Sequence, residues 1–466
     1  MRSPSPKKIP TLNEPRFCGS ARAMFHDRLG LLRRVETECG DIGQIRLWRF
    51  PIVVINKAEY VQAVLVEHAG DFDKRAQLPI VRATAGNGLF SAFGHSGEHR
   101  RQRKLLQPVF QPRHLVTYTQ TIVEIARRVQ SSWQDGQTIG IERKRERITM
   151  GIAGQTFFGV DLLNEARELG ATITRLFALF GEELQSPWMF PSWIPTPHNR
   201  RVRAAVSHLE ETLMPIIHKR RQQLSGREDF LSLLLQARYE DGTPLSEREV
   251  RDQAMTMFMA GHETMAVALT WTWYLLSQHP SVYDRARAEV DQAVGERDPV
   301  LDDLPQMPFV LQVFKESLRL YPPADIISLR VALRDVEIDG YRIARRMPII
   351  ISPYAPHRKT EIFPDPENFD PERFTAENEK KLPRCAYLPF GARARVCIGQ
   401  HFALMEGHLV LAALLQSVRF HLDENQRIEA QAVFTTRPKN DIQMIVQRRK
   451  VGSAQALKAS EERPAH

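Results

Sequence analysis

The sequence predicts a mainly α-helical protein with a minor β region. Apolar residues recur with helical spacing over most of the stretch from Glu98 to Arg238. A second apolar stretch, Leu245 to Gln278, opens with a capping box, because Ser246 is followed three residues later by Glu249. A helix of about 30 residues is about 45 Å long at 1.5 Å per residue. One helix is therefore expected to cross the whole domain.

The β-prone runs are short. Gln44 to Trp48 and Ile52 to Ile55 predict an early hairpin, followed by a helix over residues 58–67. Asp339-Gly340 predicts a second hairpin within Val336 to Ile343, and residues 347–352 extend the strand content. The glycine-bearing stretch from Gln77 to His95 is too irregular for a regular element, and we expect a loop that contributes apolar contacts.

A connector rich in proline and aromatic residues, Ser186 to Pro197, interrupts the helical region. Its aromatic side chains are compatible with contact to a membrane surface or with packing as a lid. Packing is the favoured interpretation, because exposed aromatic patches are rare without a partner.

Composition indicates one soluble globular domain over residues 1–466, with frayed tails at 1–15 and 452–466. Apolar residues make up 42% of the chain and charged residues 26%, and no Gly/Ser-rich linker divides it. The four cysteines form no closely spaced pair, and no secretory signal or N-terminal apolar run of about 20 residues is present. We therefore expect a cytoplasmic protein without a membrane anchor, and most simply a monomer.

The stretch from Phe390 to Gly399 carries the strongest chemical signal. Cys397 lies between a glycine-bearing loop and an apolar helical run that begins near His401. Free backbone N–H groups and the helix dipole at such a position favour the thiolate, a soft ligand that suits iron. Alone, a single cysteine in apolar surroundings is more often a buried structural residue.

The whole decapeptide resembles the haem-binding loop of the cytochrome P450 family, whose pattern is Phe-x-x-Gly-x-Arg-x-Cys-x-Gly. The matching residues are Phe390, Arg395, Cys397 and Gly399, whereas Arg393 stands where the family has glycine. The resemblance implies the cytochrome P450 fold, a triangular helical domain with a long central helix crossing over the haem. It also implies haem b as cofactor, with Cys397 as the axial ligand of the iron.

The centre of the long helix contains Ala260-Gly261-His262-Glu263-Thr264. Gly261 weakens the helix, and the Thr264 hydroxyl is placed to bond the carbonyl of Ala260. Such a motif alone is most often a local kink. It resembles the family's oxygen-activation motif, which implies proton delivery by Glu263 and Thr264, with Ala260 beside the cofactor.

Glu316 and Arg319 share one helix face, and as a bare pair they would be a weak surface ion pair. The resemblance implies instead that they form a buried structural triad with Arg373.

Two carboxylates on a haem edge need cations or donors, and the family uses a Trp or His followed four residues later by Arg. His99 and Arg103 fit that spacing, and with Arg330 and Arg395 they are our candidates for binding the propionates. A role for His99 as a metal ligand is less favoured, since no second ligand lies near it in the sequence.

The formal charge of +9 admits several anionic partners, but no nucleic-acid motif accompanies it. The remaining cations of the His99 helix, with Lys380, Lys381, Arg384 and Arg393, would form a basic patch for an acidic ferredoxin or flavodoxin. No flavin or nicotinamide fingerprint is present, so electrons must come from separate proteins, a redox partner and its reductase.

The sequence therefore predicts a haem-thiolate monooxygenase that inserts one atom of O2 into an apolar small molecule such as a terpenoid, fatty acid or polyketide. Two alternatives stay open: a peroxide-using peroxygenase or isomerase, and a non-catalytic haem sensor. Asp325, an acid beside the expected pocket, would meet a polar substrate group or point to solvent. The expected pocket residues are Leu89, Phe90, Phe93, Met257, Ala260, Ile326, Ile327 and Phe434.

Overall fold

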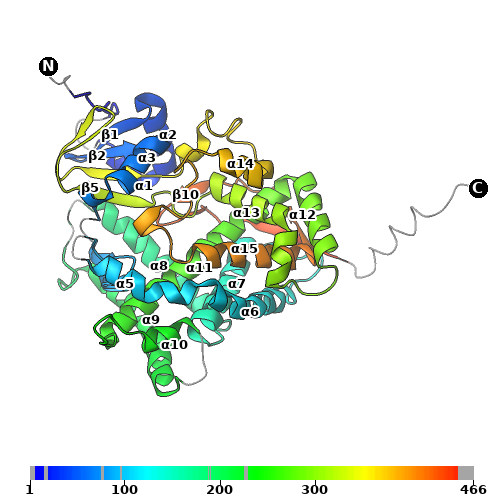
Figure 1. Cartoon of the computed structure of the whole chain (residues 1–466). Coiled ribbons are helices and arrows are strands. Elements are labelled where there is room, and N and C mark those ends of the chain that lie inside the picture. Colours follow the sequence, from blue (N-terminus) through cyan, green and yellow to red (C-terminus); the bar gives the residue numbers. More distant parts are fainter. Residues whose placement is uncertain are drawn as a thin grey trace, which may run out of the picture.

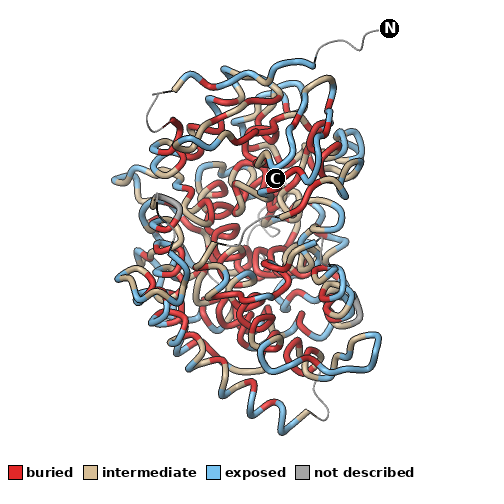
Figure 2. The backbone as a smooth tube through the Cα atoms, turned by 90° about the vertical axis from the view of Figure 1, so that its left-hand side faces the viewer, coloured by how far each residue is buried: buried red, intermediate tan, exposed pale blue. Residues whose placement is uncertain are grey.

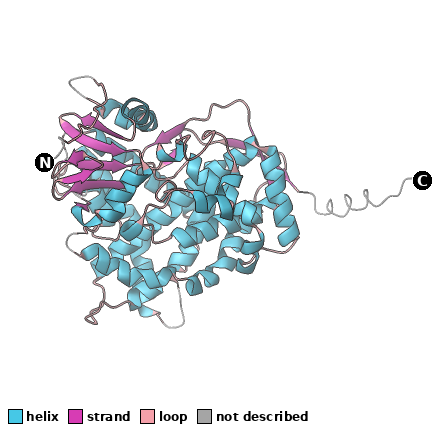
Figure 3. Cartoon of the chain, turned by 45° about the horizontal axis from the view of Figure 1, so that its top comes forward, coloured by secondary structure: helices cyan, strands magenta, loops and turns pink. Residues whose placement is uncertain are grey.

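The computed structural model describes residues 6–14, 19–74, 78–94, 97–186, 188, 190–224 and 229–449. Helices dominate these residues; the largest group of strands lies at the N-terminal side of the molecule, and other strands lie near its middle and toward the C-terminal side (Figure 3). The mainly helical class with a small β region is therefore confirmed. Figure 1 shows the early strands beside α1 to α3, with the remaining helices forming the larger part of the molecule.

Fifteen α-helices occur in the described residues. They are α1 (Ala21–His26), α2 (Arg28–Cys39), α3 (Ala58–Gln62), α4 (Pro79–Ala85), α5 (Glu98–Leu106), α6 (Pro112–Gln130), α7 (Ile141–Phe158), α8 (Ala166–Gln185), α9 (Pro197–Gln222), α10 (Phe230–Gln236), α11 (Glu247–Gln278), α12 (Pro280–Ala293), α13 (Pro308–Leu320), α14 (Ala376–Lys381) and α15 (Gln400–Leu415). A π-helical turn, η1 (Ala63–Glu67), continues α3, and the 3-10 turns used below are η3 (Gln107–Phe110) and η7 (Arg393–Arg395).

The strands of the described residues form four sheets. A five-stranded sheet has the order β1-β2-β8-β5-β3, a three-stranded sheet the order β4-β12-β9, and β6-β7 and β10-β11 are hairpins. The strands are β1 (Ile42–Leu47), β2 (Phe50–Ile55), β3 (Phe72–Asp73), β4 (Thr138–Gly140), β5 (Ser328–Ala332), β6 (Val336–Ile338), β7 (Tyr341–Ile343), β8 (Pro348–Ile351), β9 (Val418–Leu422), β10 (Ala430–Ala432), β11 (Thr436–Pro438) and β12 (Gln443–Arg448).

Both hairpins expected from the sequence are present. Ile45 pairs with Ile52 in the first. In the second, Asp339 and Gly340 have φ of 49° and 81°, the left-handed pair that a two-residue turn requires. We expected residues 1–15 to be frayed. Residues 6–14 instead lie beside β1, where the backbone N–H of Leu12 donates to the carbonyl of Gln44 (2.9 Å).

The region from Gln77 to His95 is more regular than expected. Pro79 supplies the first turn of α4, where its missing N–H costs nothing, and Ile80, Thr84 and Ala85 form the buried face of that helix. The residues after α4, up to Gly94, form the expected loop.

Helix α11 is the central element. It spans 32 residues, and the capping box of Ser246 and Glu249 is present as predicted. Most of its residues beyond the first turn are buried, in the interior that Figure 2 shows running through the helical region. At Gly261 a Cβ would lie 2.6 Å from the ring of Phe157, so the glycine allows α7 to pack closely. Within the described residues, no helix is long and apolar enough to cross a membrane.

Glu316 and Arg319 form a fully buried, bidentate ion pair on α13, with distances of 2.7 and 2.8 Å. Arg373 Nε lies 3.4 Å from Glu316, and Arg319 also donates to the carbonyl of His357 (2.7 Å). Burial raises the pKa of Glu316, and the two arginines oppose that effect. The three residues therefore join α13 to the segment that precedes α14, rather than lying on the surface.

Candidate functional site

The loop from Phe390 to Gly399 folds back on itself before α15. The N–H of Cys397 donates to the carbonyl of Phe390 (2.8 Å), and Arg103 of α5 donates to the carbonyl of Val396 (2.6 Å). Burial raises the pKa of the Cys397 thiol, whereas the N–H of Gly399 and the charge of Arg103 lower it. The expected stabilisers of the thiolate are present, but without a metal they do not outweigh burial. Cys397 has accessible surface, although the protein atoms packed around it desolvate its thiolate, so its side chain borders open space within the protein rather than bulk solvent.

Arg393 adopts the backbone conformation of the glycine that it replaces. Its φ is 56°, in the left-handed region, and its carbonyl accepts a hydrogen bond from Val396 N (3.0 Å). The loop therefore keeps its turn, at a cost of about 1–2 kcal/mol for a residue with a Cβ. The side chain of Arg393 is exposed and adds a cation to the surface beside the Cys397 loop.

Arg393→Gly is predicted to stabilise the protein by about 0.5–1 kcal/mol. Glycine removes the strain of the left-handed backbone at residue 393, and the greater entropy that it gives the unfolded chain cancels part of that gain. Denaturant unfolding of both forms measures the difference. Arg384→Gly is the matched control, since it removes an exposed arginine at a position without positive φ and should destabilise. A less stable Arg393→Gly protein would contradict the interpretation.

The middle of α11 presents Ala260 and Thr264 on one face. The Thr264 hydroxyl donates to the carbonyl of Ala260 (2.7 Å), the bond expected from the sequence. Ala260 is exposed and Thr264 half-buried, although most of their neighbours on α11 are buried. These two residues therefore border open space inside the helical region.

Glu263 lies on a different face of α11 from Thr264. It is buried, and its Oε1 accepts a hydrogen bond from the Thr435 hydroxyl (2.9 Å) in the β10–β11 hairpin. Burial raises the pKa of Glu263, while Arg437 and Thr435 lower it. No direct bond joins Glu263 to the Thr264 hydroxyl among the interactions of the described residues, so any proton relay needs an intermediate group.

Two carboxyl groups of α7 share the electrostatic surroundings of Glu263. Burial is the first cause of a raised pKa in both, to about 8 for Glu142 and about 7 for Glu146, and neighbouring carboxylates add to it. Arg437 opposes the shift in both, and Arg143 also lowers the pKa of Glu146. The group therefore favours protonated carboxyls near neutral pH, and no local sequence pattern signalled it.

Five basic side chains converge near the Cys397 loop: Lys74, His99, Arg103, Arg330 and Arg395. Burial and then the surrounding cations lower the pKa of His99 to about 4. Burial likewise lowers the pKa of Lys74 to about 7 and that of Arg330 to about 10.

Within the described residues, Arg395 Nη2 is buried without a hydrogen-bond partner, and Asp73 lies 3.7 Å from it. The structure thus brings the four basic residues expected from the sequence together, with His99 as a neutral imidazole among three arginines, and it adds Lys74, which was not expected. The sequence around Lys74 shows only a lysine after a short strand, which does not indicate a binding role.

An aromatic cluster brings together two of the expected pocket residues. Phe434 stacks on Phe177 of α8 (centroids 4.4 Å apart) and contacts Phe180 (5.0 Å) and Phe90 (6.4 Å). Leu89 and Met257 are buried in the same helical core, and Phe93 is half-buried. Phe177 and Phe180 were missed, because their spacing of three is equally typical of an ordinary core helix face.

The expected pocket residues that follow Pro322-Pro323 do not lie in the helical core with the others. Ile326 and Ile327 pack against the apolar clusters of the β region, away from the helical core. Asp325 neither meets a substrate group nor points to solvent, since it is buried and accepts a bidentate pair from Arg28 (2.5 and 2.9 Å). This ion pair links α2 to the start of β5.

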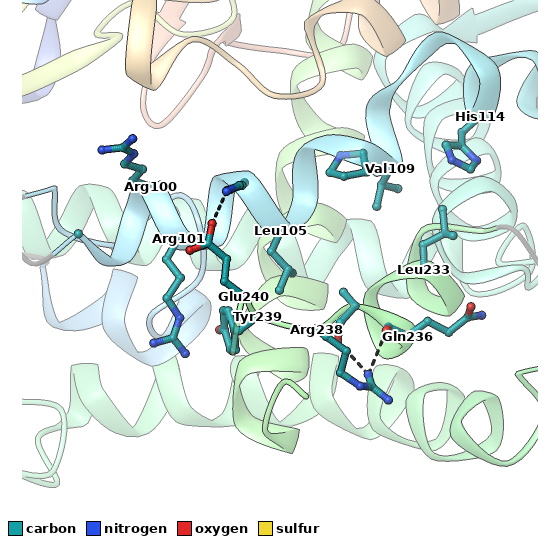
Figure 4. A pocket seen from close by; sticks show the side chains of 14 residues that line it. Arg100, Arg101, Leu105, Val109, His114, Leu233, Gln236, Arg238, Tyr239 and Glu240 are labelled. Carbon is teal, nitrogen blue, oxygen red and sulfur yellow. Dashed lines mark hydrogen bonds and ion pairs between the residues drawn. The ribbon is translucent and has the colours of Figure 1, made fainter. Parts of the chain in front are cut away.

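A surface pocket of about 720 Å³ lies between α5, η3 and α10 (Figure 4). Leu105, Val109 and Leu233 give it an apolar floor. Arg100 and Lys104 lie on its rim, where Lys104 pairs with Glu240, and Arg101 lies 3.6 Å above the ring of Tyr239. The pocket opens on the outside of the helix whose inner side contacts the Cys397 loop.

Comparison with known proteins identifies the family. The family model for cytochrome P450 matches residues 16–445. The chain is 33% identical to cyclooctat-9-en-7-ol 5-monooxygenase of Streptomyces melanosporofaciens, over 88% of this chain and 87% of that protein. It is 31% identical to pentalenene oxygenase of Streptomyces avermitilis, over 85% and 88%. The crystal structure of a cytochrome P450DA haem domain superposes with a TM-score of 0.87, at 25% identity over 96% of this chain and 99% of that one.

The chain belongs to the cytochrome P450 family, and it is an oxidoreductase of the monooxygenase type. This family carries haem iron with a cysteine thiolate ligand. The residues present fit such a group. An excess of basic side chains around one carboxylate, Asp73, with a guanidinium nitrogen that makes no hydrogen bond, suits two further carboxylates, and the accessible cysteine suits a metal.

Within the described residues, no group of three His, Cys, Asp or Glu side chains could hold a metal ion.

Proposed function

We propose that the protein hydroxylates or epoxidises a bulky apolar molecule, most simply a cyclic terpenoid, with O2 and with electrons from a separate acidic protein. The aromatic cluster of Phe90, Phe177, Phe180 and Phe434 carries this proposal. Its four rings offer an apolar wall, with Lys74 Nζ 3.9 Å from the centroid of the Phe90 ring. The two Streptomyces relatives are named for acting on cyclooctat-9-en-7-ol and pentalenene, which supports the terpenoid class.

In this proposal α11 and the Cys397 loop would hold haem b between them, and the sulfur of Cys397 would bind its iron. Bound haem iron would supply the activation of O2. Arg103, Arg330 and Arg395, with Lys74, would hold the propionates, because their like charges favour an anion between them, and the neutral imidazole of His99 would donate a hydrogen bond to the same group. Phe390 and Gly399 would shield and orient the thiolate, while Ala260 would leave room for the cofactor.

Thr264 and Glu263 would deliver protons. The Thr264 hydroxyl is held by the carbonyl of Ala260, so its oxygen faces the interior at a fixed position. Glu263 would supply that hydroxyl through Thr435 or a water molecule, since its own carboxyl bonds Thr435. The α7 carboxyls Glu142 and Glu146 would keep protons available behind it.

The electron donor would dock on the outer face of α5. Arg100, Arg101 and Lys104 lie there around the apolar floor of the surface pocket, and Lys380, Lys381, Arg384 and Arg393 are further exposed cations. An acidic ferredoxin or flavodoxin would complement this charge and approach the Cys397 loop from outside.

The experiment that tests the function is turnover of a panel of cyclic terpenes under 18O2, with a ferredoxin and its reductase. We expect one 18O atom in the product and no product without the redox proteins. Equal activity with hydrogen peroxide alone, independent of redox proteins, would replace this function with the peroxygenase alternative. Substrate-induced spectral change without turnover would support the sensor instead.

Thr264→Ala is predicted to lower the product formed per electron consumed by about tenfold or more, because the hydroxyl that moves protons at the site is lost. Measuring product, hydrogen peroxide and NADPH consumption together gives the coupling. Thr270→Ala is the matched control, since Thr270 makes the same bond to the carbonyl four residues earlier (2.8 Å) but is buried in the core. Equal coupling in both variants would contradict a role for Thr264 in proton delivery.

A further inference from the structure

The tip of the β10–β11 hairpin meets two parts of the proposed site. Residues 433–435 join the two strands. Phe434 stacks on Phe177 in the aromatic wall, with ring centroids 4.4 Å apart. The next residue, Thr435, is buried, and its hydroxyl donates to Oε1 of Glu263 (2.9 Å). A shift of the tip would therefore move the wall and the partner of this carboxyl together.

The side chain of Arg28 holds the first residue of this tip. Its Nη2 donates to the carbonyl of Val433 (3.0 Å), and the same guanidinium makes the bidentate pair with Asp325. Both charged side chains are buried, at 7% and 1% exposed. Because a guanidinium is a planar fork, its pairing with Asp325 also fixes the direction of the N–H that points at Val433.

Two further bonds attach the strand that follows the tip. The N–H of Thr436 donates to the carbonyl of Pro323 (2.9 Å), and Trp271 of α11 donates from Nε1 to the carbonyl of Thr436 (2.7 Å). Pro323 lies two residues before Asp325 in the chain. One short segment therefore holds β11 directly and holds the tip through Arg28.

The hairpin also crosses from one apolar cluster of the protein to the other. Ala432 is buried in a cluster of the β region that contains Leu32 of α2, whereas Phe434 packs against the helical core. Arg28 is the first residue of that same α2. The N-terminal helix is therefore connected to the proposed site through the hairpin.

Stability alone is a weak explanation for this buried ion pair. Moving two charges into a poorly hydrated interior costs free energy that their attraction roughly offsets, and apolar residues of similar volume often stabilise a fold equally well. Apolar residues cannot supply a hydrogen bond directed at one particular carbonyl. The bond to Val433 is the part of the arrangement that only the ion pair provides.

We propose that Arg28 and Asp325 are positioning residues for the reaction. By fixing the carbonyl of Val433 they would set how Phe434 orients a bound substrate and how Thr435 meets the carboxyl of the proton relay. This inference rests on the proposed function, since it concerns the substrate and the protons of that site. The effect is expected to be large, because a misplacement of about 1 Å can lower a rate by about 100-fold.

The test replaces both members of the pair, as Arg28→Met/Asp325→Leu. A single apolar replacement would leave the other charge buried without its partner, whereas the double change keeps the volume and removes the bond to Val433. Haem absorbance and cooperative thermal unfolding show that the variant is folded. Asp325→Asn, which keeps its volume and one acceptor, is the second variant and should change the same readouts by a smaller amount.

Two readouts follow the hairpin and the reaction. Hydrogen–deuterium exchange of residues 430–438 in the haem-loaded protein, read by mass spectrometry, should be about tenfold faster in the double variant, because the tip has lost an attachment. With a terpene that the unchanged protein oxidises, the ratio of oxidation products should change by at least about threefold, and product per electron should fall by about threefold. Loss of stability alone does not alter a product ratio.

A second buried ion pair provides the matched control. Arg220 pairs with Asp229 and also donates to a backbone carbonyl, that of Phe158 (2.8 Å), so the arrangement is the same but joins α9, α10 and α7. Arg220→Met/Asp229→Asn removes this pair, and asparagine keeps the cap that Asp229 supplies to α10. Exchange of residues 430–438 and the product ratio should stay as in the unchanged protein.

Three results would overturn the proposal. One is unchanged exchange of residues 430–438 in a folded double variant. Another is a lower melting temperature with an unchanged product ratio and unchanged coupling, which would make the pair merely structural. The third is an equal change in the control, which would assign the effect to a general loss of stability.

Failure of this inference is distinct from failure of the proposed function. The exchange measurement needs no turnover, so unchanged exchange in a protein that oxidises its terpene overturns the positioning role alone. An unchanged protein that oxidises no terpene refutes the proposed function, and with it the consequence for substrate orientation, whatever the exchange shows.

Discussion

A buried surplus of positive charge is the constraint around which the candidate site is built. Lys74 follows β3, His99 and Arg103 lie on α5, Arg330 on β5 and Arg395 on η7, so four separate parts of the chain bring basic side chains to one place. Burial first, and then the neighbouring positive charges, lower the pKa values of His99, Lys74 and Arg330, which shows that this place disfavours positive charge. A dianionic group is what would make this arrangement favourable, and the proposed haem carries two carboxylates.

The cluster of basic side chains also contacts the loop that carries Cys397. Arg103 reaches from the cation cluster to the carbonyl of Val396, so α5 and the Cys397 loop are held together by one side chain. Two effects act in opposite directions on the pKa of Cys397: burial raises it and so favours the thiol, and the N–H of Gly399 lowers it and so favours the thiolate. A bound metal would decide between them, as it does wherever a coordinating thiol is deprotonated. We therefore expect binding of the proposed cofactor to stabilise the folded form of this region.

Local patterns in the sequence predicted the local structure well. The capping box of α11, the hairpin at Asp339-Gly340 and the bond from Thr264 to Ala260 each depend on residues within a few positions of one another, so spacing alone sufficed. The family resemblance supplied the candidates that lie far apart, such as Glu316 with Arg373.

What spacing could not give is the direction of a side chain in space. Asp325 lies beside the expected pocket in sequence, yet it turns to Arg28 nearly 300 positions away (297 residues). The spacing of Phe177 and Phe180 is typical of an ordinary core-facing helix, and only the structure shows that Phe434 stacks on Phe177. Trp188 and Trp193 were expected to be covered by packing of their connector as a lid, yet they are 74% and 77% exposed.

The most direct measurement of the central claim is the absorption spectrum of the dithionite-reduced protein under carbon monoxide, recorded beside Cys397→Ser. The account predicts stoichiometric haem and a strongly red-shifted Soret band that disappears in the variant. A well-folded, haem-supplemented protein without a haem band would contradict the account, and so would a histidine-type spectrum that is the same in both proteins.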